Sequence, residues 1–122
     1  MRKNDSIVYN KAFNFSVEII KMYKFLCDEK KEYTLSKQLL RSGTSIGANI
    51  REALEGQSKK DFISKISIAN KEAAETEYWL ELFVASHILS ESEANSLLIH
   101  IEELIKILTS ILNTSKKNMH KT

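Results

Sequence analysis

The chain is marked above all by how rarely its sequence contains a residue that would interrupt a helix. Its 122 residues include no proline and only three glycines, Gly43, Gly47 and Gly56. Folds rich in β-sheet need frequent turns, and those turns depend largely on glycine and proline. Long helices joined by short connections place no such demand on the sequence. The scarcity of turn residues therefore favours an all-α fold.

Apolar residues recur at alternating intervals of three and four in four segments of the chain. This spacing places them on one stripe of a helix. We predict helices over about 5–29, 34–55, 58–87 and 90–113, followed by a basic tail over 114–122 that frays. Because short connections favour antiparallel neighbours, the sequence predicts a single domain, an antiparallel up-down-up-down four-helix bundle.

Residues with the chemistry of helix caps stand at the expected helix ends. Thr34 and Ser58 suit N-cap positions, because a hydroxyl oxygen can accept a hydrogen bond from a free backbone N–H in the first turn. Ser90 and Glu93 have the spacing of a capping box, in which each side chain bonds the other residue's backbone N–H. Gly56 fits the left-handed residue that often closes a helix.

Composition supports a folded protein and limits the chemistry that it can perform. Hydrophobic residues make up 43% of the chain, which is enough for a packed core. No uninterrupted apolar run approaches the ~20 residues of a membrane span, so we expect no membrane partner. The single cysteine, Cys27, excludes an intrachain disulfide and a multi-cysteine zinc site. The first residues lack the pattern of a signal peptide, which predicts a cytoplasmic location.

The sequence contains no pattern typical of a catalytic or metal centre. A di-iron or di-manganese bundle requires Glu-x-x-His pairs, and no glutamate stands three residues before His87, His100 or His120. The glycine segment lacks the Gly-Lys-Ser/Thr ending of a phosphate loop and lies inside a predicted helix. We therefore predict a protein that is not an enzyme and that requires no metal or other cofactor.

The second predicted helix carries small and polar residues on its inward face. Gly43 and Gly47 each cost roughly 1 kcal/mol of helix propensity relative to alanine, which a close approach of another helix would offset. Polar residues at neighbouring inward positions predict a buried hydrogen-bonded network. Its members would be Ser42, Asn49, Glu72, Glu75 and Thr76. The network either fixes helix register or forms a small binding site, and the first interpretation is favoured.

Two stretches of the chain, residues 38–53 and 68–82, resemble a known family. The first contains Arg-Ser-x-x-Ser-Ile-x-x-Asn-Ile beginning at Arg41, an unusual sequence for a helix. The family comprises bacterial four-helix-bundle proteins first noted in open reading frames within 23S ribosomal RNA intervening sequences. The resemblance extends over about residues 5–112 and departs from the family pattern at residues 53–56, where family members often have glycine sooner.

The resemblance implies a short antiparallel bundle that assembles into a ring-shaped homopentamer. Similar proteins are accessory subunits of diversity-generating retroelements, in which a basic surface contacts reverse transcriptase and nucleic acid. The residues of this chain that match the family motifs are Arg41, Ser42, Ser45, Asn49, Glu52, Glu72, Glu75 and Trp79. We interpret these positions mainly as determinants of folding and assembly.

Positive charge is concentrated in the first half of the chain. Residues 1–60 carry twelve Lys or Arg and seven Asp or Glu, whereas residues 61–122 carry six and nine. One hypothesis is that an oligomer binds structured RNA through its backbone phosphates. The candidate residues are Lys37, Arg41, Arg51, Lys59, Lys60, Lys116 and Lys117. The competing interpretation is that the basic second helix and the acidic third helix neutralise each other.

Apolar residues lie on more than one side of the third predicted helix, which leads to a second hypothesis. Such a helix either sits centrally or contacts another subunit. The chain would then be a scaffold or accessory subunit, for example of a reverse transcriptase, without direct contact to nucleic acid. The candidates for an oligomer or partner interface are Tyr78, Trp79 and Leu82.

Overall fold

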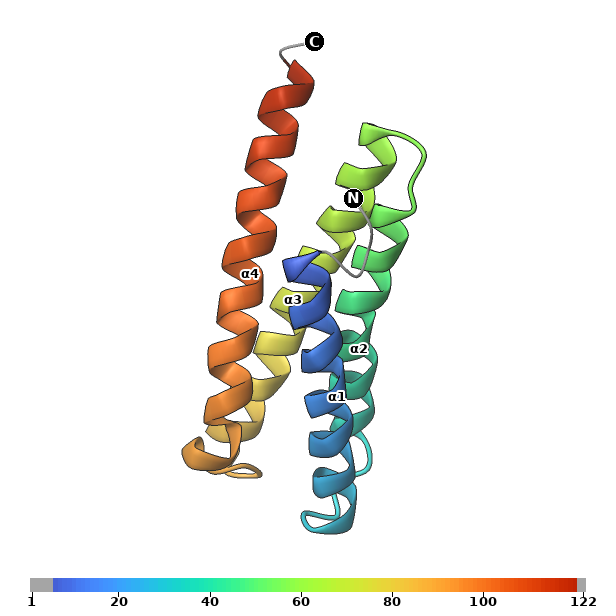
Figure 1. Cartoon of the computed structure of the whole chain (residues 1–122). Helices are drawn as coiled ribbons and strands as arrows, with labels where there is room; N and C mark the ends of the chain where they lie inside the picture. Colours follow the sequence, from blue (N-terminus) through green and yellow to red (C-terminus); the bar gives the residue numbers. More distant parts are fainter. Residues whose placement is uncertain (1–5, 121–122) are drawn as a thin grey trace.

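The computed structural model describes residues 6–120, and within them it contains four helices and no strand. The helices are α1 (Ile7–Asp28), α2 (Leu35–Leu54), α3 (Lys59–Ala85) and α4 (Glu91–His120). Figure 1 shows the chain reversing direction at each of the three connections, so that helices consecutive in sequence lie side by side. The all-α four-helix bundle predicted from the sequence is confirmed.

The core is built from the stripes that the apolar spacing predicted. In α1 the buried residues are Val8, Ala12, Phe15, Ile19 and Leu26. In α4 they are Ala94, Leu97, Ile101, Leu104, Leu108 and Leu112. Each fully buried aliphatic side chain contributes roughly 1.5–3 kcal/mol through removal of apolar surface from water. Most of the stability of the bundle therefore comes from its central stripes rather than from helix propensity.

The close approach predicted for the glycine segment of α2 is confirmed, and the neighbour is α1. A Cβ atom on Gly43 would lie 2.8 Å from two carbons of the Ile19 side chain. A Cβ on Gly47 would lie 3.6 Å from the backbone of Ala12 and from Ser16 Oγ. The absence of a side chain at Gly43 lets α1 and α2 pack closely, which is why glycine is tolerated inside a helix here, whereas the contacts at Gly47 are of ordinary length.

Two of the predicted caps are confirmed, and a third is wrong. Ser58 Oγ accepts a hydrogen bond from Asp61 N, and Ser90 forms the expected reciprocal capping box with Glu93. Thr34 precedes α2 but makes no side-chain cap bond. The carboxylate of Glu32 takes its place and accepts hydrogen bonds from three backbone N–H groups, those of residues 34–36. A carboxylate outcompetes a hydroxyl because its charge also favours the positive end of the helix dipole.

The expectation of a left-handed Gly56 is also wrong. None of the three glycines has a positive φ angle, and within the described residues that conformation belongs to Lys31 (φ 55°) and His87 (φ 63°). Gly56 instead serves a close approach, because a Cβ there would lie 3.1 Å from the carbonyl oxygen of Ala53 and 3.4 Å from Asp61 Cβ.

The fourth helix is longer than predicted. It continues through His120, whereas the sequence predicted an end at 113 and a fraying tail over 114–122, of which 121–122 lie outside the described residues. The change to polar residues after Leu112 ends burial but does not end the helix, because neither glycine nor proline follows. Figure 1 shows this end of α4 projecting beyond the other helices. The predicted start of the first helix, Asp5, lies outside the described residues.

Within residues 6–120, none of the helices combines the length and the apolar character that crossing a bilayer requires.

Candidate nucleic-acid interface

The fold gathers most of the predicted phosphate-binding residues at one end of the bundle. The last turn of α2, the first turn of α3 and the projecting end of α4 all lie at this end (Figure 1). We call it the basic end; its cationic candidates are Arg51, Lys59, Lys60, Lys116 and Lys117. The other two candidates lie elsewhere: Lys37 is in the first turn of α2, at the opposite end, and Arg41 follows one turn later.

The lysines of the basic end differ from its arginine in their partners. All four lysine side chains are exposed, and within the described residues none of them forms an ion pair. Arg51 Nε lies 3.7 Å from Glu55 Oε1, one turn away on the same helix. Unpaired cations keep their full attraction for phosphate, so the lysines are the stronger candidates.

Arg41 is held by carboxylates of α3 and is the weakest of the basic candidates. Its Nη1 lies 3.1 Å from Glu72 Oε2, and its Nη2 contacts Glu75 Oε2. The same oxygen of Glu75 accepts a hydrogen bond from Trp79 Nε1 at 3.0 Å. The guanidinium thus links α2 to α3, and its charge is neutralised within the chain. This cluster fits a role in holding the two helices together.

The remaining residues of the predicted polar network fall into separate places. Thr76 Oγ1 donates a hydrogen bond to Ser42 Oγ (2.9 Å) in the buried seam between α2 and α3, and it also lies 2.8 Å from the carbonyl oxygen of Glu72. Asn49 is half-buried, and its Nδ2 donates to the carbonyl oxygen of Ser45 in its own helix. The structure therefore joins Ser42 to Thr76 but does not join Asn49 to either.

The three predicted interface residues on α3 differ in exposure. Tyr78 is 55% exposed and lies edge-on against Trp79, with ring centroids 5.1 Å apart. Trp79 and Leu82 are half-buried. Of the three, Tyr78 offers the most surface to a partner.

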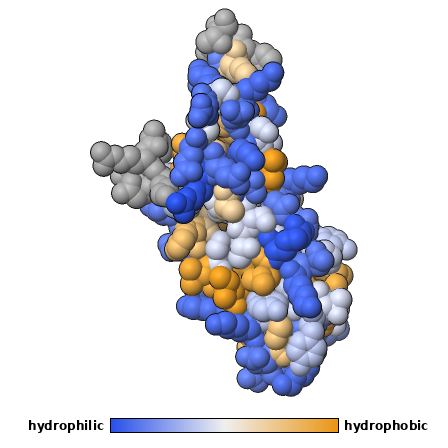
Figure 2. Space-filling model, turned by 90° about the vertical axis from the view of Figure 1, so that its right-hand side faces the viewer, coloured by the Kyte–Doolittle hydropathy of each residue, from blue (hydrophilic) through white to orange (hydrophobic). Residues whose placement is uncertain are grey.

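The sequence reading missed an apolar surface on α1. Phe13 (55% exposed), Val17 (39%) and Ile20 (41%) project from the side of α1 opposite its core stripe; we call them the α1 stripe. Their spacing of four and three could have been recognised in the sequence. It was missed because the stripe that begins with Val8 and Ala12 was already sufficient to predict the helix. Figure 2 shows the side of the molecule formed by α1 and α2, where an apolar band interrupts a polar surface.

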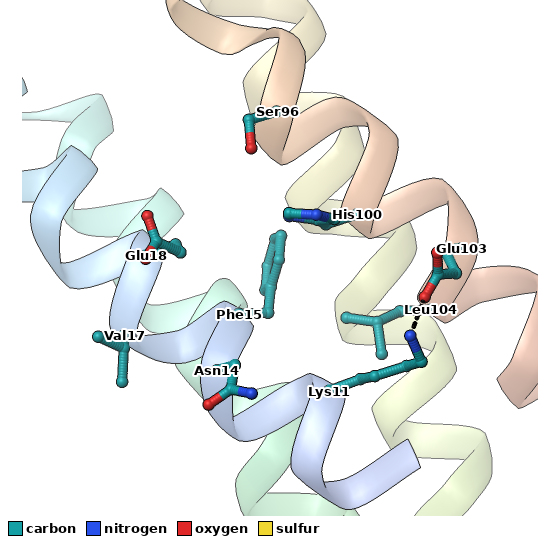
Figure 3. Close-up of a pocket in the computed structure, with 9 residues that line it drawn as sticks. All are labelled: Lys11, Asn14, Phe15, Val17, Glu18, Ser96, His100, Glu103 and Leu104. Carbon is teal, nitrogen blue, oxygen red and sulfur yellow. Dashed lines mark ion pairs between the residues drawn. The ribbon is translucent and has the colours of Figure 1, made fainter. Parts of the chain in front are cut away.

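A cleft with a volume of ≈ 570 Å³ lies between α1 and α4. Figure 3 shows the ring of Phe15 pointing towards His100, with Leu104 beside them, while polar side chains of both helices form the rim. Lys11 reaches across, and its Nζ lies 2.5 Å from Glu103 Oε1. The hydrogen bond from Lys11, its charge and the nearby His100 outweigh desolvation and hold the pKa of Glu103 below its ordinary value.

The chemistry of this cleft does not favour a phosphate ligand. Its lysine is paired with a glutamate, and a second carboxylate, that of Glu18, stands on the rim and binds Lys21 (3.4 Å). Within residues 6–120 no three His, Cys, Asp or Glu side chains gather in a way that could hold a metal ion. The cleft is therefore a weaker candidate for nucleic-acid contact than the basic end.

Comparison with known proteins places the chain in a family. The family model described as 23S rRNA-intervening sequence protein matches residues 4–110. The fold is similar to the crystal structure of a protein of unknown function from the S23 ribosomal protein family of Bacteroides thetaiotaomicron VPI-5482. The two are 51% identical with a TM-score of 0.85, over 87% of this chain and 98% of the other. No curated protein matches the chain. The chain belongs to the 23S rRNA-intervening sequence protein family.

Proposed function

We propose that this chain is a non-enzymatic, cytoplasmic RNA-binding protein, and that it acts as a homo-oligomer, a pentamer by resemblance to its family. In this proposal the basic end contacts the backbone phosphates of structured RNA. The observation that carries the proposal is that four exposed lysines, unpaired within the described residues, lie at one end of the bundle: Lys59 and Lys60 at the start of α3, and Lys116 and Lys117 near the end of α4.

The physics of phosphate binding explains why oligomerisation matters. One chain has a formal net charge of only +2, so a single copy holds RNA weakly. Five copies of a +2 chain together carry +10 and would present identical basic ends to one RNA. Contacts that are weak singly then add through effective concentration. Nothing in the basic end resembles a base-reading motif, so recognition would depend on shape and backbone charge.

The test is binding of the purified protein to a structured RNA hairpin at several salt concentrations, with the mass of the particle measured in parallel. We expect affinity to fall steeply with salt, because each phosphate contact releases counterions. The variant Lys59→Gln/Lys60→Gln/Lys116→Gln/Lys117→Gln should weaken binding by at least tenfold (on the order of 1.4 kcal/mol) and reduce the salt slope.

A control matched in charge to the two-lysine variant Lys116→Gln/Lys117→Gln, which should also weaken binding, separates this effect from loss of charge in general. Lys24→Gln/Lys71→Gln removes two exposed lysines that likewise form no ion pair in the described structure and that lie outside the basic end. This variant should bind RNA almost as the unmodified protein does. Absence of RNA binding by the unmodified protein at low salt would overturn the proposal.

A second candidate function, a protein-binding scaffold or accessory subunit, is favoured by the α1 stripe. Contiguous exposed apolar side chains on a folded protein mark surfaces that another molecule covers. The α1 stripe and Tyr78 would supply contacts between copies or with a protein partner such as a polymerase. Val17→Glu/Ile20→Glu should reduce the mass of the particle if the stripe holds copies together. If the mass of the particle were unchanged and the unmodified protein did not bind RNA, the α1 stripe would be assigned to contact with a different protein.

A further inference from the structure

A second cleft lies at the end of the bundle opposite the basic end, where two connections meet. The connection between α1 and α2 contributes residues 30–34, and the connection between α3 and α4 contributes His87 and Ile88. Its volume is ≈ 430 Å³. Segments that are more than fifty residues apart in sequence thus form one concave surface, which we call the two-loop cleft.

Both left-handed residues of the described chain line this cleft. Lys31 has φ 55° and His87 has φ 63°, a conformation that costs most residues other than glycine about 1 kcal/mol or more. His87 follows α3 at the position where glycine is usual, since its N–H bonds Val84 O (3.0 Å) and the next N–H bonds Phe83 O (3.0 Å). A turn with only a structural role would be served better by glycine. The two positions thus carry side chains that the turns themselves do not require.

The hydrogen-bond donors available to an anion in the cleft come from these same two residues, from the ammonium group of Lys31 and the imidazole ring of His87. Both side chains are exposed, and within the described residues neither forms a hydrogen bond or an ion pair. Lys30 is engaged elsewhere, because its Nζ lies 3.2 Å from Glu93 Oε1 and 5.4 Å from the centre of the Phe25 ring.

The one carboxylate in the cleft, that of Glu32, is already occupied. It accepts the hydrogen bonds from the first turn of α2 described above. Burial by itself raises the pKa of Glu32, but the bonds from the N–H groups of Leu35, Ser36 and Thr34 outweigh it, so the pKa lies below the ordinary value. The carboxylate oxygens of Glu32 are thus engaged by N–H groups at the start of α2 rather than available to a ligand.

An unoccupied aromatic ring completes the site. Tyr33 is 55% exposed, and its ring stacks on no other aromatic ring in the described structure. An exposed aromatic face beside an unpaired cation is the arrangement with which proteins hold single-stranded nucleic acid, because an unpaired base stacks on the ring and its phosphate meets the cation. A base within a duplex is already stacked and cannot use the ring in this way.

We propose that the two-loop cleft binds single-stranded nucleic acid, with a base stacked on Tyr33 and an adjoining phosphate held by Lys31 and His87. This inference shares with the proposed function only the choice of nucleic acid as partner. It assigns unpaired nucleotides to one end of the bundle and leaves the structured part of an RNA to the basic end.

The experiment measures fluorescence anisotropy of two labelled probes with the full chain, a single-stranded decauridylate and a blunt RNA duplex of ten base pairs. Tyr33→Ala should weaken binding of the single strand on the order of tenfold, the effect of losing one stacked base. Binding of the duplex should not change. Ile99→Ala is the control, because Ile99 is 54% exposed but lies on α4, outside the cleft. It should leave both probes unaffected.

The two side chains are tested with a residue that tolerates their backbone conformation. Glycine adopts the left-handed region without steric cost, so Lys31→Gly and His87→Gly remove the charge of one side chain and the ring donor of the other without unfolding the turns. Each should weaken single-strand binding several-fold, and Lys31→Gly should lower the salt slope by about 0.7, the value for one phosphate of a single strand. Circular dichroism checks that the variants remain helical.

The outcomes distinguish this inference from the proposed function. Single-strand binding that depends on Tyr33, with no duplex binding, would support the cleft and overturn the role of the basic end. Duplex binding with a single-strand affinity that Tyr33→Ala leaves unchanged would do the reverse. An equal loss from Ile99→Ala would also overturn the cleft, since the effect would then belong to any exposed apolar side chain. Binding of neither probe would overturn both.

Discussion

The seams that α2 forms with its two neighbours differ in construction from the seam between α1 and α4. Around α2 the helices meet through small residues and a buried hydrogen bond, with Gly43 against Ile19 and Ser42 against Thr76. Between α1 and α4 a cleft separates the helices and an exposed ion pair crosses it. The first kind of seam fixes the distance between the two helix axes, because the facing atoms are already in contact. The second can change its width by moving long side chains.

This difference indicates where the bundle is constrained and where it can adapt. Residues packed around α2 should tolerate substitution poorly, since close-packed interiors resist changes of even one methyl group. Residues along the α1–α4 seam should tolerate substitution well. The expectations that follow test this contrast by the free energy of unfolding, beginning with the largest effect.

Adding a single methyl group at Gly43 should have the largest effect. In Gly43→Ala the new Cβ meets carbons of Ile19, a fully buried side chain that has no free space into which to move. Overpacking costs roughly 1–3 kcal/mol and alanine returns about 1 through helix propensity, so a net loss of up to about 2 kcal/mol is expected. Urea denaturation measures it.

Gly47→Ala is the matched control for this substitution. Its Cβ would find its nearest neighbours at 3.6 Å, an ordinary contact. The gain in helix propensity should then prevail, and the variant should be as stable as the unmodified protein or more stable by up to about 1 kcal/mol. If both alanine variants lost stability equally, the distinction between the two contacts would be wrong.

Removing the buried hydroxyl of Thr76 should have an intermediate effect. Thr76→Val keeps the shape of the side chain but leaves Ser42 Oγ without its partner on α3, which costs about 1 kcal/mol. A double-mutant cycle with Ser42→Ala isolates the pair and should give a coupling of about 0.5–1 kcal/mol. Thr114→Val, an exposed site on α4, should be neutral. A coupling near zero would mean that packing alone holds this seam.

Replacing Glu77 should stabilise the protein, and the gain should depend on pH. Burial, followed by the charges of Glu81 and Glu102, raises the pKa of Glu77 above its ordinary value. A carboxyl group whose folded pKa is raised opposes folding when it is charged, so Glu77→Gln should increase the unfolding midpoint at pH 7. The gain should shrink as the pH falls through the folded pKa and vanish below about 4.3, the ordinary value. A gain that grew at low pH would contradict this cause.

Breaking the ion pair across the α1–α4 cleft should have the smallest effect. The side chains of Lys11 and Glu103 are each 45% exposed, and exposed pairs gain little because water screens them. Lys11→Met should therefore leave the unfolding midpoint at pH 7 unchanged within error in a thermal melt. A loss comparable to that of Gly43→Ala would remove the contrast between the two kinds of seam.

The fold could be predicted from the sequence, but the surfaces could be predicted only in part. The positions of the helices were predicted from the spacing of apolar residues. The close approach at Gly43 was predicted because glycine destabilises a helix interior and a close contact would offset that cost. The end of α4 was predicted too early, because polarity was taken as the sign of a helix end when it marked only the end of burial. Glu32 was missed as a cap because it stands two residues before the expected cap position.

The surfaces depend on which segments come together, and that information is distributed over the chain. Tyr33 and His87 are unremarkable singly and form a candidate site only because two connections end at the same place. Conversely, Arg41 resembled a phosphate ligand until α3 brought Glu72 and Glu75 beside it. Local patterns predict elements, whereas charge neutralisation and clefts arise from contacts between elements.

Because α4 is one continuous helix, the direction in which Lys116 and Lys117 project depends on the number of residues that precede them in the helix. One residue inserted between Leu112 and Lys116 would rotate both terminal lysines by about 100° around the helix axis, while moving them only ~1.5 Å outward. Seven inserted residues, close to two full turns, would restore their direction and displace them by ~10 Å. The angle at which this end presents its charge is thus a periodic function of chain length, and changes of length by whole turns should be accepted most readily.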